Sequence, residues 1–396
     1  SQLATSERFS FKEQLIIADI DVQRLQADRL RNSAFIIGNQ NPNKKNEFET
    51  ISLNNLGANN IYSEPSDVTR TFAPHPFVPP EDEMTTRCNE IFSIQVGGLA
   101  TRLFHTGIKK AVVGISGGLD STLALLVMVK TFDKLGLPRE NIVGITMPGF
   151  GTTGRTYNNS LNMMKSLGVT IKEVDIKPAC LQHLKDIDHD LSILDVSYEN
   201  TQARERTQIL MDYANKIGGL VVGTGDLSEL VLGWATYNGD HMSMYAVNTS
   251  IPKTLVRYMV KYAALYEMDE AAKETLLDVC DTPVSPELLP ADDKGEISQK
   301  TEDLVGPYEL HDFFIYYTLR FGFSPTKIFF MAQKAFDGQY DKATILKWMR
   351  TFYWRFFAQQ FKRSCMPDGP KVGSVSLSPR GDLRMPSDAC SKIWIE

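Results

Sequence analysis

Residues 111–129, AVVGISGGLDSTLALLVMV, contain the pattern that decides the fold of this chain. The pattern predicts an apolar strand over 111–115, a tight turn over 116–118, and an apolar helix that begins near Leu119 or Asp120. Two adjacent glycines permit positive φ angles and leave no Cβ between the main chain and a ligand. The start of a helix presents unpaired N–H groups and a partial positive charge. The stretch therefore predicts an anion site, and phosphate is the anion we expect.

The turn differs from two common phosphate-binding loops, since it lacks the Lys of G-x-x-x-x-G-K-[ST] and the spacing of G-x-G-x-x-G. Residues 116–121, SGGLDS, resemble instead the S-G-G-x-D-S loop of ATP pyrophosphatases, which cleave ATP between its α and β phosphates. A structural Gly-Gly turn is the alternative. Asp120 is either a plain N-cap or, because the loop has no Lys, a carboxylate that holds Mg²⁺. The second role is the one we expect.

Strands and helices continue to alternate after this stretch. We expect further strands over 141–148, 170–176 and 220–226, and helices over 155–167 and 202–219. This order predicts an α/β fold with a doubly wound, Rossmann-like parallel sheet of the ATP pyrophosphatase type, covered on both faces. Such sheets bind ligands beyond the carboxyl ends of their strands, near the point where the strand order reverses.

The rest of the chain divides into segments of different composition. Residues 1–85 include Asn-rich and Pro-rich stretches and are interpreted as a tail and a linker, and residues 86–365 as the nucleotide-binding domain with a helical extension. The extension is helical after Ile251, and its aromatic-rich part at 309–363 is expected to form core or a subunit interface. Residues 366–396 are interpreted as a loop segment that lies on the surface or closes over an anionic ligand.

The composition excludes several classes of protein. A net charge of −6 with scattered Lys and Arg gives no basic surface for nucleic acid. No apolar run reaches the roughly 18–20 residues that span a bilayer, and the polar start without Met is typical neither of a leader nor of a complete chain. The five cysteines form no C-x-x-C, so neither a disulfide framework nor a zinc site is expected, and a reduced cytoplasm is the expected setting. Cys88 is expected to be a buried thiol rather than a nucleophile.

A second group of polar residues follows the strand predicted at 220–226. In 223–240, GTGDLSELVLGWATYNGD, the residues of interest are Thr224, Asp226, Glu229, Asp240, Trp234 and Tyr237. Acidic residues beside a polyphosphate repel it unless they hold Mg²⁺, although Glu229 has the alternative of a plain surface position. In the loop 151–156, Arg155 and the hydroxyls either bind nucleotide phosphates or only cover the site.

Four segments together resemble the glutamine-dependent NAD⁺ synthetases: ENTQARER (199–206), residues 223–240, NTSIPKTLVR (248–257) and SPRGDLRMPSD (378–388). The resemblance covers roughly residues 88–390. The start of the chain, IADIDVQRLQADRLRNSAF, resembles the last part of the glutaminase domain of that family. The resemblance implies that the nitrilase-like part, which releases ammonia, is missing. It therefore implies that this chain uses free ammonia, while the longer protein uses glutamine.

The resemblance also implies the reaction. Ammonia is joined to the nicotinate carboxylate of deamido-NAD⁺ after ATP has activated that carboxylate as an adenylate, and AMP and pyrophosphate are released. Mg²⁺ on Asp120 and Glu229 neutralises the developing charge, and Lys253 is the candidate cation that stabilises the phosphoryl transition state. No side-chain nucleophile is required, so positioning and electrostatics lower the barrier.

The same resemblance assigns the binding residues. Those implied for ATP are Gly114, Ile115, Ser116, Gly117, Gly118, Leu119, Asp120, Ser121 and Thr224, and those implied for deamido-NAD⁺ are Asn200, Glu229, Trp234, Ala235, Thr236, Tyr237 and Lys371. Trp234 and Tyr237 suit stacking on a pyridine ring, or else pack under a loop. Lys371 acts in its own subunit or in a neighbour. Asp226 replaces the Asn of many relatives, which leaves its role open.

Two other functions compete with this interpretation. One is another ATP pyrophosphatase ligase, such as a GMP-synthetase-like or tRNA-modifying enzyme. A tRNA-modifying enzyme should carry a basic face or paired catalytic cysteines. The other is a nucleotide-binding module without catalysis, which has no need of two metal-holding carboxylates. We expect the protein to self-associate, because of the aromatic helices. We also expect it to work with a glutaminase domain and to bind neither membrane nor nucleic acid.

Overall fold

The computed structural model describes residues 2–39, 68–283, 285, 288–289 and 301–395 of the 396-residue chain. Its centre is a five-stranded parallel sheet of order β3-β2-β1-β4-β5. The strands are β1 Ala111–Gly114, β2 Ile142–Thr146, β3 Thr170–Glu173, β4 Leu220–Gly223 and β5 Tyr245–Ala246. The predicted doubly wound α/β fold is confirmed, and the strand order reverses between β1 and β4, where such sheets bind ligands.

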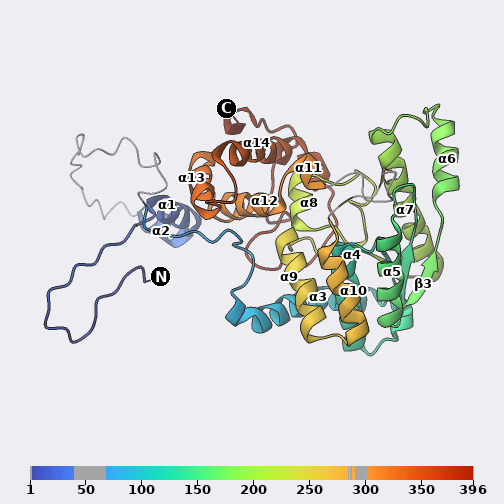
Figure 1. The fold of residues 1–396 in the computed structure, drawn as a ribbon, viewed down its shortest axis with the longest axis horizontal. Coiled ribbons are helices and arrows are strands. Elements are labelled where there is room, and N and C mark those ends of the chain that lie inside the picture. Colours follow the sequence, from blue (N-terminus) through green and yellow to red (C-terminus); the bar gives the residue numbers. More distant parts are fainter. Residues whose placement is uncertain (1, 40–67, 284, 286–287, 290–300, 396) are drawn as a thin grey trace.

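Helices connect and cover these strands (Figure 1). The helices are α1 Val22–Arg31, α2 Ser33–Asn39, α3 Met84–Thr106, α4 Leu119–Leu135, α5 Gly154–Ser166, α6 Lys177–Asp186, α7 Val196–Ile217, α8 Leu227–Leu232, α9 Lys253–Tyr266, α10 Glu270–Asp281, α11 Thr301–Val305, α12 Tyr308–Ile315, α13 Pro325–Ala335, α14 Lys342–Ala358, α15 Gln360–Arg363 and α16 Lys392–Ile395. Short turns of other helical types lie at η3 Glu81–Glu83, η4 Arg139–Asn141 and η5 Tyr316–Arg320.

Alternate residues of β1 enter two different layers of the core. Ala111 and Val113 pack with α3, α4 and α9 in one cluster, and Val112 packs on the other face with Ala214 of α7 and Cys180 of α6. This alternation follows from the period of two in a strand, since both faces of a parallel sheet are covered. The helix α4 is buried along most of its length, which fixes the position of its first turn.

The aromatic-rich C-terminal helices form a third cluster rather than an exposed stripe. Phe313, Phe314, Phe336 and Phe352 are fully buried there, and residues of α8 belong to the same cluster. The expectation that these aromatic residues form core is confirmed. Within the described part of the chain, no helix combines the length and apolar character that crossing a membrane requires.

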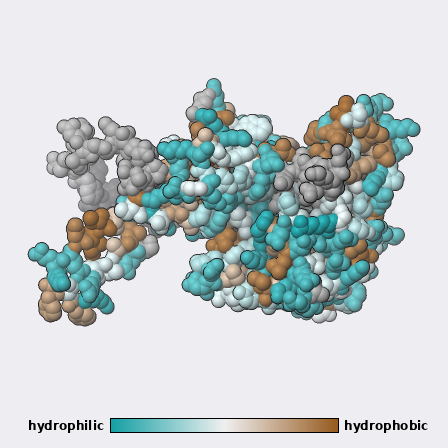
Figure 2. All heavy atoms as spheres, in the orientation of Figure 1, coloured by the Kyte–Doolittle hydropathy of each residue, from teal (hydrophilic) through white to brown (hydrophobic). Residues whose placement is uncertain are grey.

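The N-terminal residues extend away from the body of the molecule (Figure 1). Large apolar side chains on this arm are almost fully exposed, including Phe9 and Phe11, and Figure 2 shows brown surface on it. The arm is attached through α1, where Asp21 pairs with Lys327 of α13 and the guanidinium of Arg24 lies over the ring of Phe321. The Asn-rich part of the expected linker, at 40–67, lies outside the described residues.

Several predicted boundaries are wrong by a few residues. The helix predicted at 202–219 begins at Val196, because Asp195 caps it by accepting hydrogen bonds from the N–H groups of Ser197 and Tyr198. The predicted strands run one to three residues past the observed C-terminal ends, although single backbone hydrogen bonds, such as that from Ile115 N–H to Ile145 O at 2.9 Å, continue beyond those ends. The short strand β5 and the helix α6 were not predicted. The expectation that Cys88 is a buried thiol is confirmed, since Cys88 on α3 is fully buried, which raises the pKa of its thiol to about 11.

Candidate active site

The turn after β1 depends on one glycine in a left-handed conformation. Gly117 has φ +85°, and a Cβ added there would lie 2.1 Å from the carbonyl oxygen of Thr156. Gly118 has φ −92°, so the expectation of positive φ holds for the first glycine alone. The close approach to Thr156 brings the loop 151–156 beside the turn, as the order of the strands predicts. Arg155 of that loop instead pairs with Asp278 of α10 at 2.6 Å.

The turn leaves backbone donors at the start of α4. Its first residue is Leu119, as predicted, and the capping residue Gly118 has no side chain to satisfy the first N–H groups of the helix. The hydroxyl of Ser116 accepts a hydrogen bond from the N–H of Gly118 at 3.2 Å and lies 3.2 Å from the hydroxyl of Ser121. The arrangement offers N–H and O–H donors to an anion.

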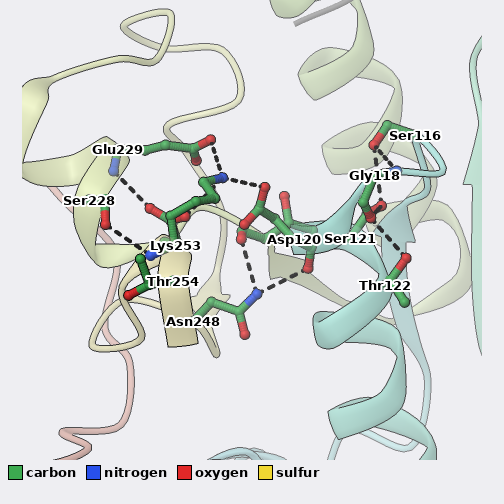
Figure 3. Close-up of polar contacts among 12 residues, drawn as sticks. Ser116, Gly118, Asp120, Ser121, Thr122, Ser228, Glu229, Asn248, Lys253 and Thr254 are labelled. Carbon is green, nitrogen blue, oxygen red and sulfur yellow. Dashed lines mark hydrogen bonds and ion pairs between the residues drawn. The ribbon is translucent and has the colours of Figure 1, made fainter. Parts of the chain in front are cut away.

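A buried lysine lies among three carboxylates beyond the carboxyl ends of β1 and β4, and Figure 3 shows it between two of them, Asp120 and Glu229. The Nζ of Lys253 is 2.6 Å from Asp120 Oδ2, 2.8 Å from Asp226 Oδ2 and 2.9 Å from Glu229 Oε1. Lys253 is 4% exposed and Asp226 is completely buried. The three residues singled out as catalytic, Asp120, Glu229 and Lys253, are therefore brought together from α4, α8 and α9.

The open question about Asp226 has a structural answer. Its carboxylate caps α8 by accepting a hydrogen bond from the N–H of Glu229 at 2.7 Å, and it also pairs with Lys253. Asn at this position could cap the helix equally well, but it would bring no charge to Lys253. The sequence left this role open because the pairing with Lys253 joins two separate elements, although the cap itself is a local contact.

Burial and mutual repulsion set the ionisation of the cluster. Burial raises the pKa of Asp226 well above its usual value and that of Glu229 to about 7, while the ammonium of Lys253 opposes both shifts. Burial alone would lower the pKa of Lys253, but the three carboxylates outweigh it and hold that pKa well above its usual value. The cluster therefore keeps a charged lysine, while Asp226 and Glu229 bind protons more readily than exposed carboxylates do. A further cation bound there would compete with those protons.

A second carboxylate network fixes the backbone of Lys253. Asp312 of α12 is buried and accepts hydrogen bonds from the hydroxyls of Ser228 at 2.5 Å and Thr254 at 2.6 Å. The hydroxyl of Ser228 in turn accepts from the N–H of Lys253 at 2.9 Å. The ring of Tyr308 lies 5.2 Å from the Nζ of Lys253. Sequence analysis missed Asp312 and Tyr308, although an acidic residue inside the apolar run HDFFIYY is a signal of a buried carboxylate.

An asparagine links the segments that follow β1 and β4. The Nδ2 of Asn248 donates to the carbonyl oxygens of Asp120 at 3.0 Å and Thr224 at 3.1 Å. This residue lies in the quoted segment 248–257 but was assigned no role. The contact places Thr224 beside the phosphate turn, as its expected role in ATP binding requires, and holds the loops after β1 and β4 in one arrangement.

The residues expected to bind the dinucleotide make contacts at several separate places. Asn200 of α7 and Thr236 lie together, since the Thr236 hydroxyl donates to Asn200 Oδ1 at 2.7 Å. Trp234 is partly buried, and the guanidinium of Arg355 lies 5.2 Å from its ring centre. Tyr237 is 44% exposed and stacks on His241 at 5.3 Å. Lys371 is exposed and pairs with Asp382 rather than with one of these residues.

A pocket opens beside Glu229. It is lined by Gly223, Gly225, Glu229, Leu230, Ala235, Asp240, His241, Ser243, Ala246, Thr249 and Pro367. Pro367 belongs to the C-terminal segment, which is held here by hydrogen bonds from the N–H of Ala246 to Asp368 O at 2.8 Å and from the Ser250 hydroxyl to Pro370 O at 3.0 Å. The first part of residues 366–396 therefore lies against the site.

The donor set fits a hard divalent cation. Asp120, Asp226 and Glu229 each offer a carboxylate oxygen, and these oxygens lie within 4.8 Å of one another. The Oδ1 of Asp120 is buried and accepts no hydrogen bond from the described residues. Oxygen ligands from carboxylates are those that Mg²⁺ prefers.

Comparison with known proteins decides the family. The profile of the family described as NAD synthase matches residues 92–270, which contain β1 to β5, the phosphate turn and the lysine cluster. The glutamine-dependent NAD(+) synthetase of Mycobacterium leprae is 39% identical over 426 residues, an alignment that covers 100% of this chain and 61% of the relative. Residues 92–270 are a domain of the NAD synthase family. The family resemblance seen in the sequence is thus confirmed.

Solved structures of low sequence identity share the fold of this NAD synthase domain. A glutamine-dependent NAD(+) synthetase from Cytophaga hutchinsonii superposes with a TM-score of 0.63 at 17% identity, over 78% of this chain and 55% of the other. The NMN synthetase of Francisella tularensis gives 0.53 at 22% identity, over 70% of this chain and 95% of the other. These likenesses concern the fold alone.

Proposed function

We propose that this chain catalyses the ATP-dependent amidation of deamido-NAD⁺ to NAD⁺, with release of AMP and pyrophosphate. The observation that carries the proposal is the junction of a phosphate turn with a charged cluster: α4 begins at the turn and carries Asp120 directly into contact with Lys253. The family match supports the choice of substrates. The chain spans 61% of the length of the M. leprae relative, so the activity of the whole protein is part of the proposal.

The first step activates the nicotinate carboxylate. An oxygen of this carboxylate attacks the α-phosphorus of ATP, the bond from that phosphorus to the bridging oxygen breaks, and pyrophosphate leaves. The first N–H groups of α4 with the hydroxyls of Ser116 and Ser121 are the donors that hold the pyrophosphate. The charge of Lys253 stabilises the negative charge that develops in this step.

Mg²⁺ completes the site in this proposal. Asp120 and Glu229 would hold it, and Asp226, which the structure adds to the set, supplies a third oxygen. When bound, Mg²⁺ neutralises phosphate charge. The chain's own part is to keep the three carboxylates together, because Lys253 pairs both with Asp226, the N-cap of α8, and with Glu229 within that helix.

The second step forms the amide. Ammonia attacks the activated carbonyl carbon, the added nitrogen loses a proton to water, the bond from that carbon to the phosphate oxygen breaks, and AMP leaves. No side chain becomes covalently attached, so the site contributes position and charge. The second step requires that the adenylate remain away from water between the two steps.

Binding roles are assigned by position around the cluster. Those proposed for ATP are Gly114, Ile115, Gly117, Gly118, Leu119 and Thr224 beside the turn, and those proposed for deamido-NAD⁺ are Asn200, Glu229, Trp234, Ala235, Thr236, Tyr237 and Lys371. The contact between Thr236 and Asn200 supports a common surface for the dinucleotide. Lys371 has the least support, because its contact is with Asp382.

The domain division and the partners remain proposals as well. We infer that residues 1–85 belong to a glutaminase domain and its linker, that residues 86–365 form the synthetase domain, and that residues 366–396 close on the site. The exposed apolar side chains of the N-terminal arm, such as Phe9 and Phe11, support an apolar partner surface, which the longer relatives suggest is the glutaminase domain. A homo-oligomer in the cytoplasm is also proposed.

Turnover assays test this function. The purified chain is incubated with ATP, Mg²⁺, ammonium chloride and deamido-NAD⁺, with glutamine replacing ammonium in a parallel reaction. NAD⁺ and AMP in equal amounts, with ammonium alone as nitrogen donor, support the proposal. AMP formed only with another acceptor, such as xanthosine monophosphate or nicotinate mononucleotide, or ATP binding without turnover, would contradict it.

A further inference from the structure

The short helix α8 connects the two halves of the site. Asp226 caps its first turn, and Glu229 within it faces Lys253. After its last residue, Leu232, the chain runs directly into the segment 234–237 that we assign to deamido-NAD⁺. A six-residue helix is too short to be stable alone, so its position depends on what holds its ends.

Two arginine side chains, from α14 and α15, hold the C-terminal end of α8. Arg355 Nε donates to Leu232 O at 2.8 Å, and Arg363 Nη1 donates to Val231 O at 2.8 Å and to Leu230 O at 3.2 Å. These carbonyls would otherwise be unpaired, and cations are favourable at a helix C-terminus. Arg363 is almost completely buried, so these contacts belong to the core of the C-terminal helices.

Lys362 reaches beyond the helix to the substrate segment itself. Its Nζ donates to Gly233 O at 2.8 Å and to Ala235 O at 2.7 Å. The carbonyl oxygen of Lys362 accepts from His241 Nε2 at 2.8 Å. One residue thus holds the two ends of the segment 233–241, which contains Trp234, Thr236 and Tyr237.

The backbone around this contact leaves little room for another arrangement. Gly233 has φ +58°, and a Cβ added there would lie 2.2 Å from the Cβ of Gln359 at the end of α14. A side chain at this position would separate α8 from the C-terminal helices. Close approach at Gly233 is therefore what allows Lys362 to reach two carbonyls at once.

We propose that Lys362 is a positioning residue that sets the affinity of the site for the dinucleotide substrate by fixing the segment 233–241. The proposal rests on the proposed function, because it assigns deamido-NAD⁺ to that segment. Within the described part of the chain, Lys362 contacts Gly233, Ala235 and His241 and neither the phosphate turn nor the lysine cluster, so its effect should fall on the dinucleotide and not on ATP. Its role lies in an interaction between the C-terminal helices and a loop of the sheet domain.

Substitutions at Lys362 give a test that separates positioning from general stability. Lys362→Met removes both donors, and we expect the KM for deamido-NAD⁺ to rise about tenfold while the KM for ATP changes less than twofold. Lys362→Gln keeps an NH₂ group with two donors, so part of the affinity should return. The control is Lys342→Met, at an exposed position in the first turn of α14, which should leave both KM values unchanged.

Results other than this rise in the KM for deamido-NAD⁺ alone would overturn the proposal. Equal rises in both KM values, together with a lower midpoint of thermal unfolding, would show that Lys362 only stabilises the fold. If Lys362→Met does not fold, Lys362→Gln and the wild type are compared by calorimetry with deamido-NAD⁺ and with ATP, and equal affinities for the dinucleotide contradict the proposal. If the wild type binds ATP but not deamido-NAD⁺, the proposed function is overturned as well. If the wild type makes NAD⁺ and the Lys362 variants keep its KM for deamido-NAD⁺, this inference alone is overturned.

Discussion

Lys253 and Asp120 are 133 positions apart in the sequence, and yet the ammonium of Lys253 lies 2.6 Å from Oδ2 of Asp120. The contact joins the first residue of α9 to the first turn of α4, so the phosphate turn and the carboxylate cluster form one unit. Because both side chains are at the carboxyl ends of the parallel strands, the charge is concentrated where such a sheet binds ligands.

Asp120→Asn should abolish catalysis without unfolding the chain. The amide is nearly the same size but carries no charge, so one ion pair with Lys253 and one candidate metal ligand are lost. We expect pyrophosphate release to fall by roughly a hundredfold or more. Asp133→Asn on the same helix, which breaks only an exposed pair with Arg139, is the control. Normal turnover by Asp120→Asn would show that its assigned role is wrong.

Gly117→Ala and Gly118→Ala compare a position where a Cβ would clash with one where a Cβ has room. At Gly117 the added methyl group meets the Thr156 carbonyl in a left-handed conformation, so we expect a loss of about 2 kcal/mol of stability and weaker ATP binding. At Gly118 φ is ordinary and the nearest atom to an added Cβ is Ser116 Oγ at 3.4 Å. Chemical denaturation of both variants should give the smaller loss for Gly118→Ala, and equal losses would contradict the described turn.

Trp234→Ala should weaken binding of the dinucleotide more than binding of ATP. Removal of the ring leaves Arg355 without its aromatic partner and takes away a candidate stacking surface. We expect the KM for deamido-NAD⁺ to rise about tenfold. Trp354→Ala, at a half-exposed position on α14, controls for loss of a tryptophan. An unchanged KM in Trp234→Ala would remove this residue from the substrate site.

The fold and the turn are predictable from the sequence because their signals are local. The strand–turn–helix at 111–129, the alternation of elements and the acidic group after β4 all lie within short windows. The contacts of Asp312 with Ser228 and of Lys362 with Ala235 join residues more than eighty positions apart. No local pattern marks such pairs. The sequence therefore predicted that the aromatic residues of the C-terminal helices form core, but not that these helices contact the site.

His311 should make the protein less stable in acid. It is fully buried and its Nε2 pairs with Val305 O at 2.7 Å, and burial lowers its pKa from 6.5 to about 4. The unfolded chain therefore binds more protons than the folded chain between these two pH values, so stability is lost as the pH falls through that range. Between pH 7 and pH 5 the loss attributable to this residue is about 2 kcal/mol.

Urea denaturation of the wild type and His311→Gln at the two pH values measures this contribution. Glutamine cannot titrate but retains a donor for Val305 O, so the variant should lose about 2 kcal/mol less than the wild type over the same change of pH. The other titrating groups contribute equally to both proteins and cancel in the difference. Identical losses in the two proteins would mean that His311 is not held neutral in the folded state.

The most direct test of the central claim follows an oxygen atom. Deamido-NAD⁺ labelled with ¹⁸O in its nicotinate carboxylate is incubated with this chain, ATP, Mg²⁺ and ammonium, and the products are analysed by mass spectrometry. Attack of the carboxylate on the α-phosphorus, beside the turn at Ser116–Ser121, predicts one labelled oxygen in each AMP and none in pyrophosphate. Unlabelled AMP, or label in inorganic phosphate formed with ADP, would contradict the account.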